Sequence, residues 1–261
     1  MEAQAGQDFP DAVSVVNAAS SASVVLVCEH ASCRVPPRYA KLGLAEADLQ
    51  RHIGWDIGAL DLALECSRSL DAPLVHAGYS RLLLDVNRSP DAPDSIVEHS
   101  EDTVIPGNLQ LSQPERLARE QGLYAPFHAA LAGVIEARRA ADPGLAVVNI
   151  HSFTPVYRGV TRPWLVGILS DRDRRLADGM LQSLRREVGL CCGDNEPYSP
   201  RDRVYHTLDR HAQSQGLPSV MIEVRNDQLL TAEGRAAWAV RLCSALGDAL
   251  GSLPTGLKKR T

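Results

Sequence analysis

Short apolar runs alternate along this chain with longer segments in which apolar residues recur at helical spacing. Residues 24–28 and 145–150 are almost continuously apolar, which is typical of strands buried on both faces. Residues 46–70 and 114–141 carry apolar side chains at the spacing of an amphipathic helix. Strands that alternate with helices predict an α/β fold with a mostly parallel sheet that has helices on both faces.

The remaining predicted elements continue this alternation. Strands are predicted over residues 72–76, 82–86, 164–169 and 219–224, and helices over residues 172–188 and 231–250. Pro126 is expected to interrupt the long helix in the middle of the chain. The polar stretch 88–112 exceeds the usual length of a loop, and such loops inside compact domains are usually lids or binding loops.

The length of the chain limits the number of domains. A chain of 261 residues fits one large α/β domain or two small ones. The sequence contains no internal repeat and no linker of the kind that separates domains. We therefore expect an irregular lead-in over residues 1–20, one domain over residues 21–252 and a frayed tail over residues 253–261.

The charge balance argues against some classes of partner. The chain has 27 Lys and Arg against 32 Asp and Glu, a net charge of -5, whereas nucleic-acid-binding proteins usually present a basic face or tail. The basic cluster Lys258-Lys259-Arg260 lies at a terminus that is expected to fray. No run of 18 apolar residues is present, so we expect no contact with a membrane.

The start of the chain and its cysteines favour a cytoplasmic protein. The first residues lack the basic start and the apolar stretch of a secretory signal. The six cysteines, at positions 28, 33, 66, 191, 192 and 243, form no CxxC pair. We expect them to be reduced thiols rather than disulfides. The sequence leaves open whether the chain forms a homo-oligomer.

Ionisable and amide side chains occur where several predicted strands end. Because ligands of open α/β sheets bind beyond the carboxyl ends of the strands, we expect these side chains to converge on one site. They are Glu29-His30 after residues 24–28, Asp85 and Asn87-Arg88 around the end of residues 82–86, His151-Ser152 after residues 145–150, and Glu223 and Arg225 at the end of residues 219–224.

His30 and His151 with one carboxylate would make a three-ligand site for a divalent metal, the arrangement of catalytic zinc. Asp56 is the favoured carboxylate because it opens a helical segment after Gly54-Trp55, where the chain can face the crevice. Glu29 is the alternative, although it and His30 are neighbours on an extended strand and point to opposite faces. One histidine at a strand end is more often structural, but two flanked by carboxylates favour a metal site.

Asn87-Arg88 supplies an amide and a forked guanidinium, which suit bidentate recognition of a substrate carboxylate. Arg81 and Arg162 are weaker candidates for the same role. The alternative interpretation is an ordinary turn, in which Arg88 pairs with one of the acidic residues.

Glu223 lies in an otherwise apolar run, and a carboxylate is rarely buried without a partner. It either pairs with a neighbour such as Arg225 or acts as a general base whose pKa is raised by apolar surroundings. A serine nucleophile is the competing mechanism, but Ser32, Ser80 and Ser152 lie in no G-x-S-x-G elbow.

These residues lie in segments that resemble the N-formylglutamate amidohydrolase family, in particular its branch of predicted amidohydrolases. The resemblance runs in family order from about residue 23 to about residue 250. The matching segments are 28–32 (CEHAS), 52–59 (HIGWDIGA), 79–88 (YSRLLLDVNR), 151–155 (HSFTP), 193–198 (GDNEPY) and 222–225 (IEVR).

This family is distantly similar to zinc carboxypeptidases and aspartoacylases. The resemblance therefore implies that residues 21–252 form a single catalytic α/β domain with a mixed, twisted sheet. The carboxypeptidase pattern has a glutamate three residues after the first histidine, where this chain has Cys33. Glu29 or Asp56 must then supply the carboxylate. The roles implied are zinc binding for His30 and His151, binding of a substrate carboxylate for Asn87 and Arg88, and general base for Glu223.

The reaction implied by the resemblance is metal-dependent hydrolysis of the amide C–N bond of a small carboxylate-bearing substrate, such as an N-formyl or N-acyl amino acid. The expected enzyme is similar to N-formylglutamate deformylases, and its expected cofactor is a divalent metal, zinc. The alternative is a non-catalytic small-molecule-binding protein, or a degenerate family member whose site is structural. That alternative predicts no tightly bound metal and no turnover.

Overall fold

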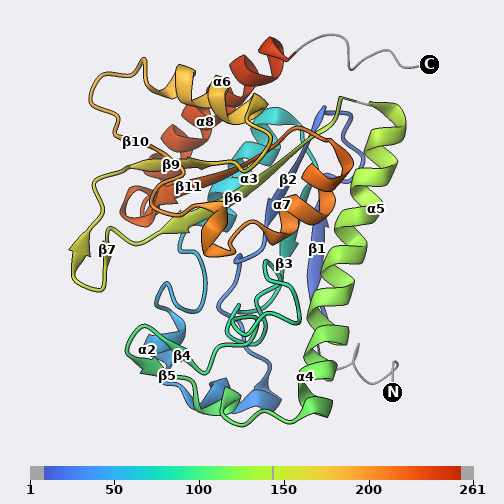
Figure 1. The fold of residues 1–261 in the computed structure, drawn as a ribbon, viewed down its shortest axis with the longest axis vertical. Helices are drawn as coiled ribbons and strands as arrows, with labels where there is room; N and C mark the ends of the chain where they lie inside the picture. Colours follow the sequence, from blue (N-terminus) through green and yellow to red (C-terminus); the bar gives the residue numbers. More distant parts are fainter. Residues whose placement is uncertain (1–8, 143, 254–261) are drawn as a thin grey trace.

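A seven-stranded sheet forms the centre of the computed structural model, which describes residues 9–142 and 144–253 (Figure 1). The predicted buried strands β2 and β6 lie next to each other in its interior. In the order of the sheet, the strands are β1 (Val13–Val16), β3 (Leu74–Ala77), β2 (Val24–Cys28), β6 (Ala146–Phe153), β11 (Ser219–Arg225), β9 (Val166–Leu169) and β10 (Cys192–Asp194).

The sheet is mixed and mostly parallel, as predicted. Strands β3, β2, β6 and β11 run parallel to one another, and β10 is parallel to β9. The antiparallel pairs are β1 with β3 and β11 with β9. The carboxyl ends of β2, β6 and β11 therefore meet at one edge of the sheet, where an α/β fold places its ligand crevice.

Helices cover both faces of the sheet, which confirms the predicted architecture. On one face lie α3 (Ala59–Leu70), α6 (Arg175–Leu184) and α8 (Ala232–Ser252), and on the other lie α5 (Ala125–Ala141) and α7 (His206–His211) (Figure 1). Successive residues of a strand point to opposite faces, so Val148 packs in the cluster under α3, α6 and α8, and Val147 packs in the cluster under α5.

The long helix predicted over residues 114–141 is present with an irregular turn near its middle. Helix α4 (Gln113–Arg119) passes through a π-helical turn (Glu120–Tyr124) into α5. Pro126 lies in the first turn of α5, where a missing N–H group is tolerated. The long helix is therefore interrupted by a π-helical bulge and does not end near Pro126.

The predicted lead-in over residues 1–20 contains a strand that the sequence pattern did not reveal. Strand β1 pairs antiparallel with β3 at the edge of the sheet, with Val13 opposite Ala77. Residues 1–8 lie outside the described residues, as do residues 254–261 of the predicted tail with the cluster Lys258-Lys259-Arg260.

The prediction of a strand over residues 82–86 is wrong. This segment is buried but forms turns, in which Leu83 N donates to Ser80 O and Arg88 N donates to Asp85 O. Its backbone carbonyls are satisfied by side chains instead of a neighbouring strand. Asn108 Nδ2 donates to Leu82 O at 2.8 Å, and Arg119 Nη1 donates to Leu83 O at 3.0 Å.

The helix predicted over residues 46–70 is divided into α2 (Glu46–Leu49) and α3 by an irregular segment. The predicted loop 88–112 contains a small hairpin of β4 (His99–Ser100) and β5 (Thr103–Val104), and a second hairpin consists of β7 (Val156–Tyr157) and β8 (Val160–Thr161). Short 3₁₀ turns cover Pro37–Gly43, Pro106–Asn108, Pro200–Asp202, Gln213–Gln215 and Asn226–Leu229. Within the described residues, every helix is too short or too polar to cross a membrane.

Candidate functional site

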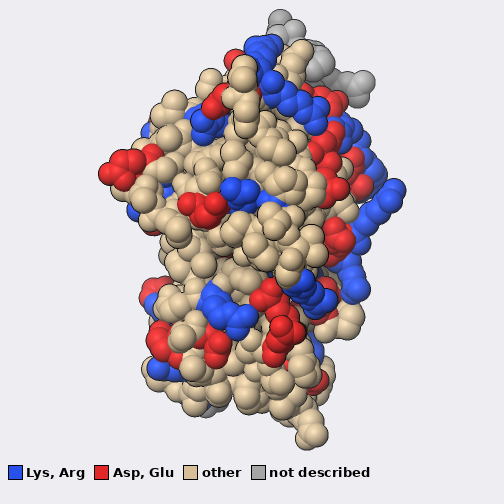
Figure 2. All heavy atoms as spheres, turned by 90° about the vertical axis from the view of Figure 1, so that its left-hand side faces the viewer, with Lys and Arg blue, Asp and Glu red and all other residues tan. Residues whose placement is uncertain are grey.

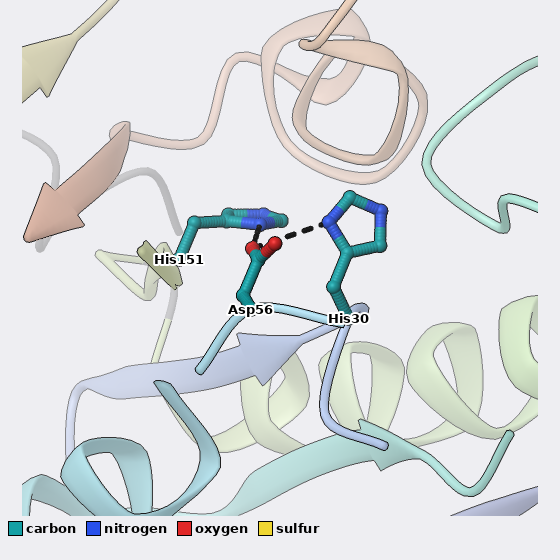
Figure 3. A group of neighbouring side chains, drawn as sticks. All are labelled: His30, Asp56 and His151. Atoms are coloured by element: carbon teal, nitrogen blue, oxygen red, sulfur yellow. Dashed lines mark hydrogen bonds and ion pairs between the residues drawn. The ribbon is translucent and has the colours of Figure 1, made fainter. Parts of the chain in front are cut away.

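His30, Asp56 and His151 meet in a buried group at the carboxyl edge of the sheet (Figure 3). One carboxylate oxygen, Asp56 Oδ2, lies 2.7 Å from His151 Nδ1 and 3.2 Å from His30 Nδ1. One potential ligand atom from each residue lies within 4.8 Å of the others. The structure thus brings together the three residues that the sequence analysis selected.

Hydrogen bonds of the segment around Asp56 explain how residues so far apart in the sequence meet. The main-chain N–H of Asp56 donates to His30 O at 2.9 Å. The hydroxyl of Ser80 donates to Gly54 O, and that of Ser152 donates to Ile57 O, each at 2.8 Å. These two serines therefore clamp the segment that carries Asp56, a use of their hydroxyls that differs from the nucleophilic alternative.

Each histidine contacts a second carboxylate through its other ring nitrogen. His30 Nε2 lies 2.8 Å from Asp85 Oδ1, and His151 Nε2 lies 3.1 Å from Glu29 Oε2. Asn149 Nδ2 in turn donates to the other oxygen of Glu29 at 2.5 Å. Carboxylates in this position orient imidazole ligands of metals and fix their tautomer. Glu29 faces the ring nitrogen opposite to the one that faces Asp56, which favours Asp56 as the carboxylate of the group.

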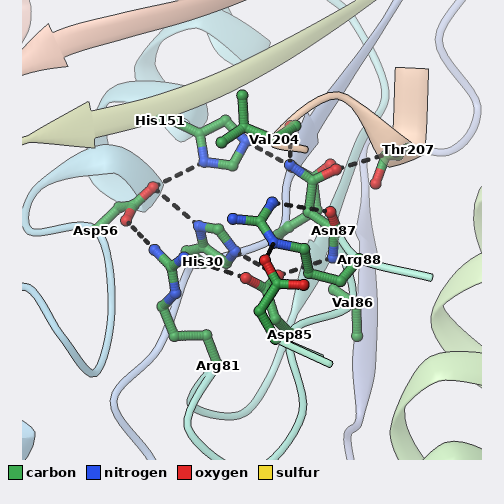
Figure 4. Close-up of polar contacts among 12 residues, drawn as sticks. His30, Asp56, Arg81, Asp85, Val86, Asn87, Arg88, His151, Val204 and Thr207 are labelled. Carbon is green, nitrogen blue, oxygen red and sulfur yellow. Dashed lines mark hydrogen bonds and ion pairs between the residues drawn. The ribbon is translucent and has the colours of Figure 1, made fainter. Parts of the chain in front are cut away.

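The imidazoles and carboxylates of this group stabilise each other's charged forms. Burial and the charge of Arg81 act to lower the pKa of His30, but the carboxylates of Asp85 and Asp56 outweigh them, so the pKa is raised. Burial would raise the pKa of Asp56, yet the two imidazoles hold it far below its usual range. Arg81 adds ion pairs to both carboxylates, at 3.1 Å from Asp85 and 3.5 Å from Asp56 (Figure 4).

The donor set fits a divalent metal. Two imidazole Nδ1 atoms and one carboxylate oxygen point toward one another, and two imidazoles with a carboxylate are the protein ligands of many catalytic zinc sites. His30 Nε2 is hydrogen-bonded to Asp85, and His151 Nε2 lies in an ion pair with Glu29 that lacks hydrogen-bond geometry. Both Nε2 atoms thus face a carboxylate, which leaves the Nδ1 atoms as the ligand atoms.

Glu223 lies beside this group and is not paired with Arg225. It stands in register with His151 on the neighbouring strand, so the two side chains share one face of the sheet. Burial is the main cause that raises the pKa of Glu223 to about 7. No described residue hydrogen-bonds to its Oε2 atom. Arg225 donates instead to both carboxylate oxygens of Asp227, at 2.9 and 3.1 Å.

A pocket of about 270 Å³ contains the group and Glu223. Its wall includes Glu101 of the turn between β4 and β5, Tyr157 of β7, and Tyr198. Figure 2 shows the side of the molecule to which the carboxyl ends of β6 and β11 point in Figure 1. The surface there is hollowed between a larger upper part and a smaller lower part, with acidic and basic side chains intermixed.

Of the four residues predicted to bind a substrate carboxylate, Arg81, Asn87 and Arg88 line the pocket. The amide of Asn87 is engaged by the backbone, since its Nδ2 donates to Val204 O at 2.6 Å and its Oδ1 accepts from Thr207 N at 3.0 Å (Figure 4). Arg162 lies outside the pocket lining and donates to the hydroxyl of Tyr198 at 3.0 Å.

Arg88 keeps part of its guanidinium available. Its Nη1 donates to Arg203 O at 2.6 Å, while its Nε lies 3.3 Å from Asp94 in an ion pair. Both Arg88 and Asp94 line the pocket. An anionic group entering the pocket therefore meets a guanidinium that is anchored at one end.

Sequence reasoning missed several residues of the pocket. Asp85 is among the side chains that the sequence analysis expects at the site, but its contact with His30 is not predicted by a strand over residues 82–86. His52, Glu101 and Tyr198 also line the pocket, and the first and last of these lie in segments of the family resemblance. Glu101 lies in the polar stretch 88–112, whose length indicates a lid or binding loop, but no sequence pattern singles out this residue within the stretch.

Comparisons with known proteins identify the family and the fold of this chain. The family model described as N-formylglutamate amidohydrolase matches residues 22–230. Gene product Atu2144 from Agrobacterium tumefaciens is 45% identical in sequence. Its crystal structure matches with a TM-score of 0.91 over 94% of this chain and 99% of that chain. N-formylglutamate amidohydrolase from Ralstonia eutropha JMP134 is 19% identical and shares the fold, with a TM-score of 0.72 over 94% of this chain and 98% of that chain. A search of curated proteins found no match.

Proposed function

This chain belongs to the N-formylglutamate amidohydrolase family, and we propose that it hydrolyses the amide C–N bond of a small N-formyl or N-acyl amino acid in a metal-dependent reaction. The observation that carries this proposal is the pocket itself. It combines a His-Asp-His group with a separate buried carboxylate whose pKa is raised to about 7.

His30, Asp56 and His151 would hold the metal, for which zinc is the proposed identity. Bound there, a divalent metal supplies Lewis acidity, which polarises an amide carbonyl and makes water a better nucleophile. The chain's own contribution is to fix the ligands. Asp85 is hydrogen-bonded to His30 Nε2, and Glu29 lies 3.1 Å from His151 Nε2, which leaves both Nδ1 atoms facing Asp56.

Glu223 is the proposed general base. Its Oε2 atom has no hydrogen-bond partner among the described residues, so it is available to take a proton from the attacking water. The same carboxyl group can then donate this proton to the nitrogen of the leaving amine. A carboxyl group with a pKa near neutrality suits both steps because it exchanges protons readily at physiological pH.

Arg88 is proposed to bind the carboxylate of the substrate, with Asn87 shaping the wall beside it. The guanidinium forms a planar fork of donors that matches a carboxylate. It reaches the pocket with its Nη1 already fixed to Arg203 O, so less motion is lost when the substrate binds. Arg81 is more strongly engaged, by Asp56 and Asp85, and is the weaker candidate.

The decisive experiment measures metal content and hydrolysis together. Protein purified without chelators should contain close to one equivalent of a divalent metal, and zinc-loaded protein should release amine from at least one member of a panel of N-formyl and N-acetyl amino acids. Metal without turnover on the panel would exclude the proposed substrate class, whereas the binding-protein alternative predicts neither metal nor turnover. Absence of metal, with none gained on zinc addition, would refute the proposed site.

A further inference from the structure

A pair of histidines outside the pocket contacts the loop over residues 85–88, which carries Asp85, Asn87 and Arg88. His128 of α5 and His211 of α7 are both buried. Their rings are nearly parallel, with centroids 5.0 Å apart and an interplanar angle of 12°. Neither residue lines the pocket.

The two imidazoles form a hydrogen-bonded chain that ends on the 85–88 loop. His128 Nε2 lies 2.9 Å from Val86 O, and His128 Nδ1 lies 2.7 Å from His211 Nε2. A carbonyl oxygen can only accept, so His128 Nε2 carries the hydrogen. In neutral His128 the Nδ1 atom then accepts from His211 Nε2. The arrangement of protons is therefore fixed, with both rings neutral.

The surroundings of the pair favour the neutral forms. Burial lowers the pKa of His128 to about 3 and that of His211 to about 4, and the charge of Arg210 acts in the same direction on both. His206 lies near them, with its ring centroid 5.6 Å from that of His128, but its Nε2 is engaged by the hydroxyl of Tyr124 at 2.8 Å.

The contact matters because the 85–88 loop has no neighbouring strand to hold it. Val86 stands between Asp85, which contacts His30, and Asn87 (Figure 4). Helix α7 also contacts the loop directly, since Thr207 N donates to Asn87 Oδ1. One short helix thus fixes Asn87 directly at its start and Val86 through His211 and His128 at its end.

We propose that His128, oriented by His211, is a positioning residue that sets the 85–88 loop and thereby the place of Arg88 in the pocket. The loop position is a property of the fold alone. Its effect on substrate binding rests on the proposed function. The donor that matters is the one to Val86 O, and the contact between the two rings serves to keep that donor on Nε2.

Two amide substitutions separate the two contacts of His128. His128→Gln places an amide group near the Nε2 position and can keep the donor to Val86 O. His128→Asn places the amide near the Nδ1 position, keeps a partner for His211 and leaves Val86 O without its donor. His206→Asn is the matched control, because it disturbs the same cluster without a contact to the loop.

Hydrogen exchange and kinetics are then measured on the same zinc-loaded proteins. In His128→Asn, amide exchange of the peptide over residues 82–90 should accelerate about tenfold, and KM for an N-formyl amino acid should rise about tenfold with kcat changed less than threefold. His128→Gln and His206→Asn should both stay within about threefold of the wild type in each measurement. Equal behaviour of the Asn and Gln variants at position 128 would overturn the proposal.

The two readouts keep the positioning role apart from the proposed function. If no substrate is turned over by the wild type, faster exchange confined to His128→Asn still supports the positioning role. Faster exchange with unchanged KM would refute the link to substrate binding. If His128→Asn does not fold, the pair His211→Gln and His211→Ala replaces it: only the Ala variant should raise exchange over residues 82–90, and no difference between the two would overturn the proposal.

Discussion

The buried carboxylate of Glu223 is tolerated because it borders a group of positive and polar side chains rather than apolar core alone. Burial raises its pKa to about 7, while the charge of His151 acts to lower it. A carboxyl group in such a position costs stability when it is ionised and has no partner. At the residue scale, this cost in stability supports the proposed role of Glu223 as a general base.

Replacing Glu223 with Gln should lower kcat by roughly 10²- to 10⁴-fold, which is the usual effect of losing a positioned general base. Metal content should stay unchanged, because Glu223 is not one of the three proposed ligands. Steady-state kinetics per mole of bound zinc measures the effect. A variant that turns over at the wild-type rate would remove Glu223 from the mechanism.

The same variant has a pH-dependent effect on the stability of the metal-free protein. The pKa of Glu223 rises from 4.5 to about 7 on folding, so ionisation opposes folding. The free-energy cost of ionising Glu223 in the folded protein is absent below about pH 4 and grows as the pH rises. It is complete above about pH 7, where it lowers the free energy of unfolding by about 3 kcal/mol. Thermal melts should therefore show Glu223→Gln more stable than the wild type at pH 8 but not at pH 4.

Replacing Arg88 with Lys keeps the positive charge and loses the planar fork. It should raise KM or lower kcat/KM more than tenfold, about 1.4 kcal/mol or more, if the guanidinium binds a substrate carboxylate. Initial rates on the substrate identified in the panel measure this. A silent substitution would assign Arg88 a structural role through its bond to Arg203 O and direct attention to Arg81.

At the scale of elements, the sequence pattern predicted the interior strands and failed at irregular, buried segments. Strand β2 is a continuous apolar run and β6 begins with one, which is typical of strands buried on both faces. Residues 82–86 are equally apolar, yet Asn108 and Arg119 satisfy their carbonyls from distant segments. Periodicity carries no information about such side-chain partners. The convergence of His30 and His151 was predictable because His30 follows β2 and His151 lies near the carboxyl end of the adjacent parallel strand β6. The positions of Asp85 and Glu101, in contrast, depend on loops.

The turn that leads to Asp56 requires Gly54. A Cβ atom at this position would lie 2.4 Å from Leu49 O, so the segment between α2 and α3 would have to shift. Gly54→Ala should therefore weaken zinc binding more than tenfold, measured by competition with a chelator. Gly133→Ala in α5 is the control, because a Cβ there has open space, and it should leave zinc affinity unchanged. Equal affinity of the Gly54 variant would mean that the turn does not set the position of Asp56.

At the scale of the whole molecule, the proposed metal would connect three segments that only the folded sheet brings together. They are the end of β2, the turn before α3 and the end of β6. A ligand that binds the native state alone stabilises it by mass action, about 4 kcal/mol at a thousand times its dissociation constant. For a chain of this size, this corresponds to an increase in melting temperature of about 10 °C.

Zinc added to the metal-free protein should therefore raise its melting temperature by about that amount, and removal with a chelator should reverse the change. His151→Ala should lose most of the increase, since it removes one of three proposed ligands, while His99→Ala, on the exposed β4 strand, should keep it. This comparison separates specific binding from general effects of zinc on exposed histidines. An increase of the same size in His151→Ala would place the metal elsewhere on the molecule, and no increase in the wild type would refute the proposed metal site.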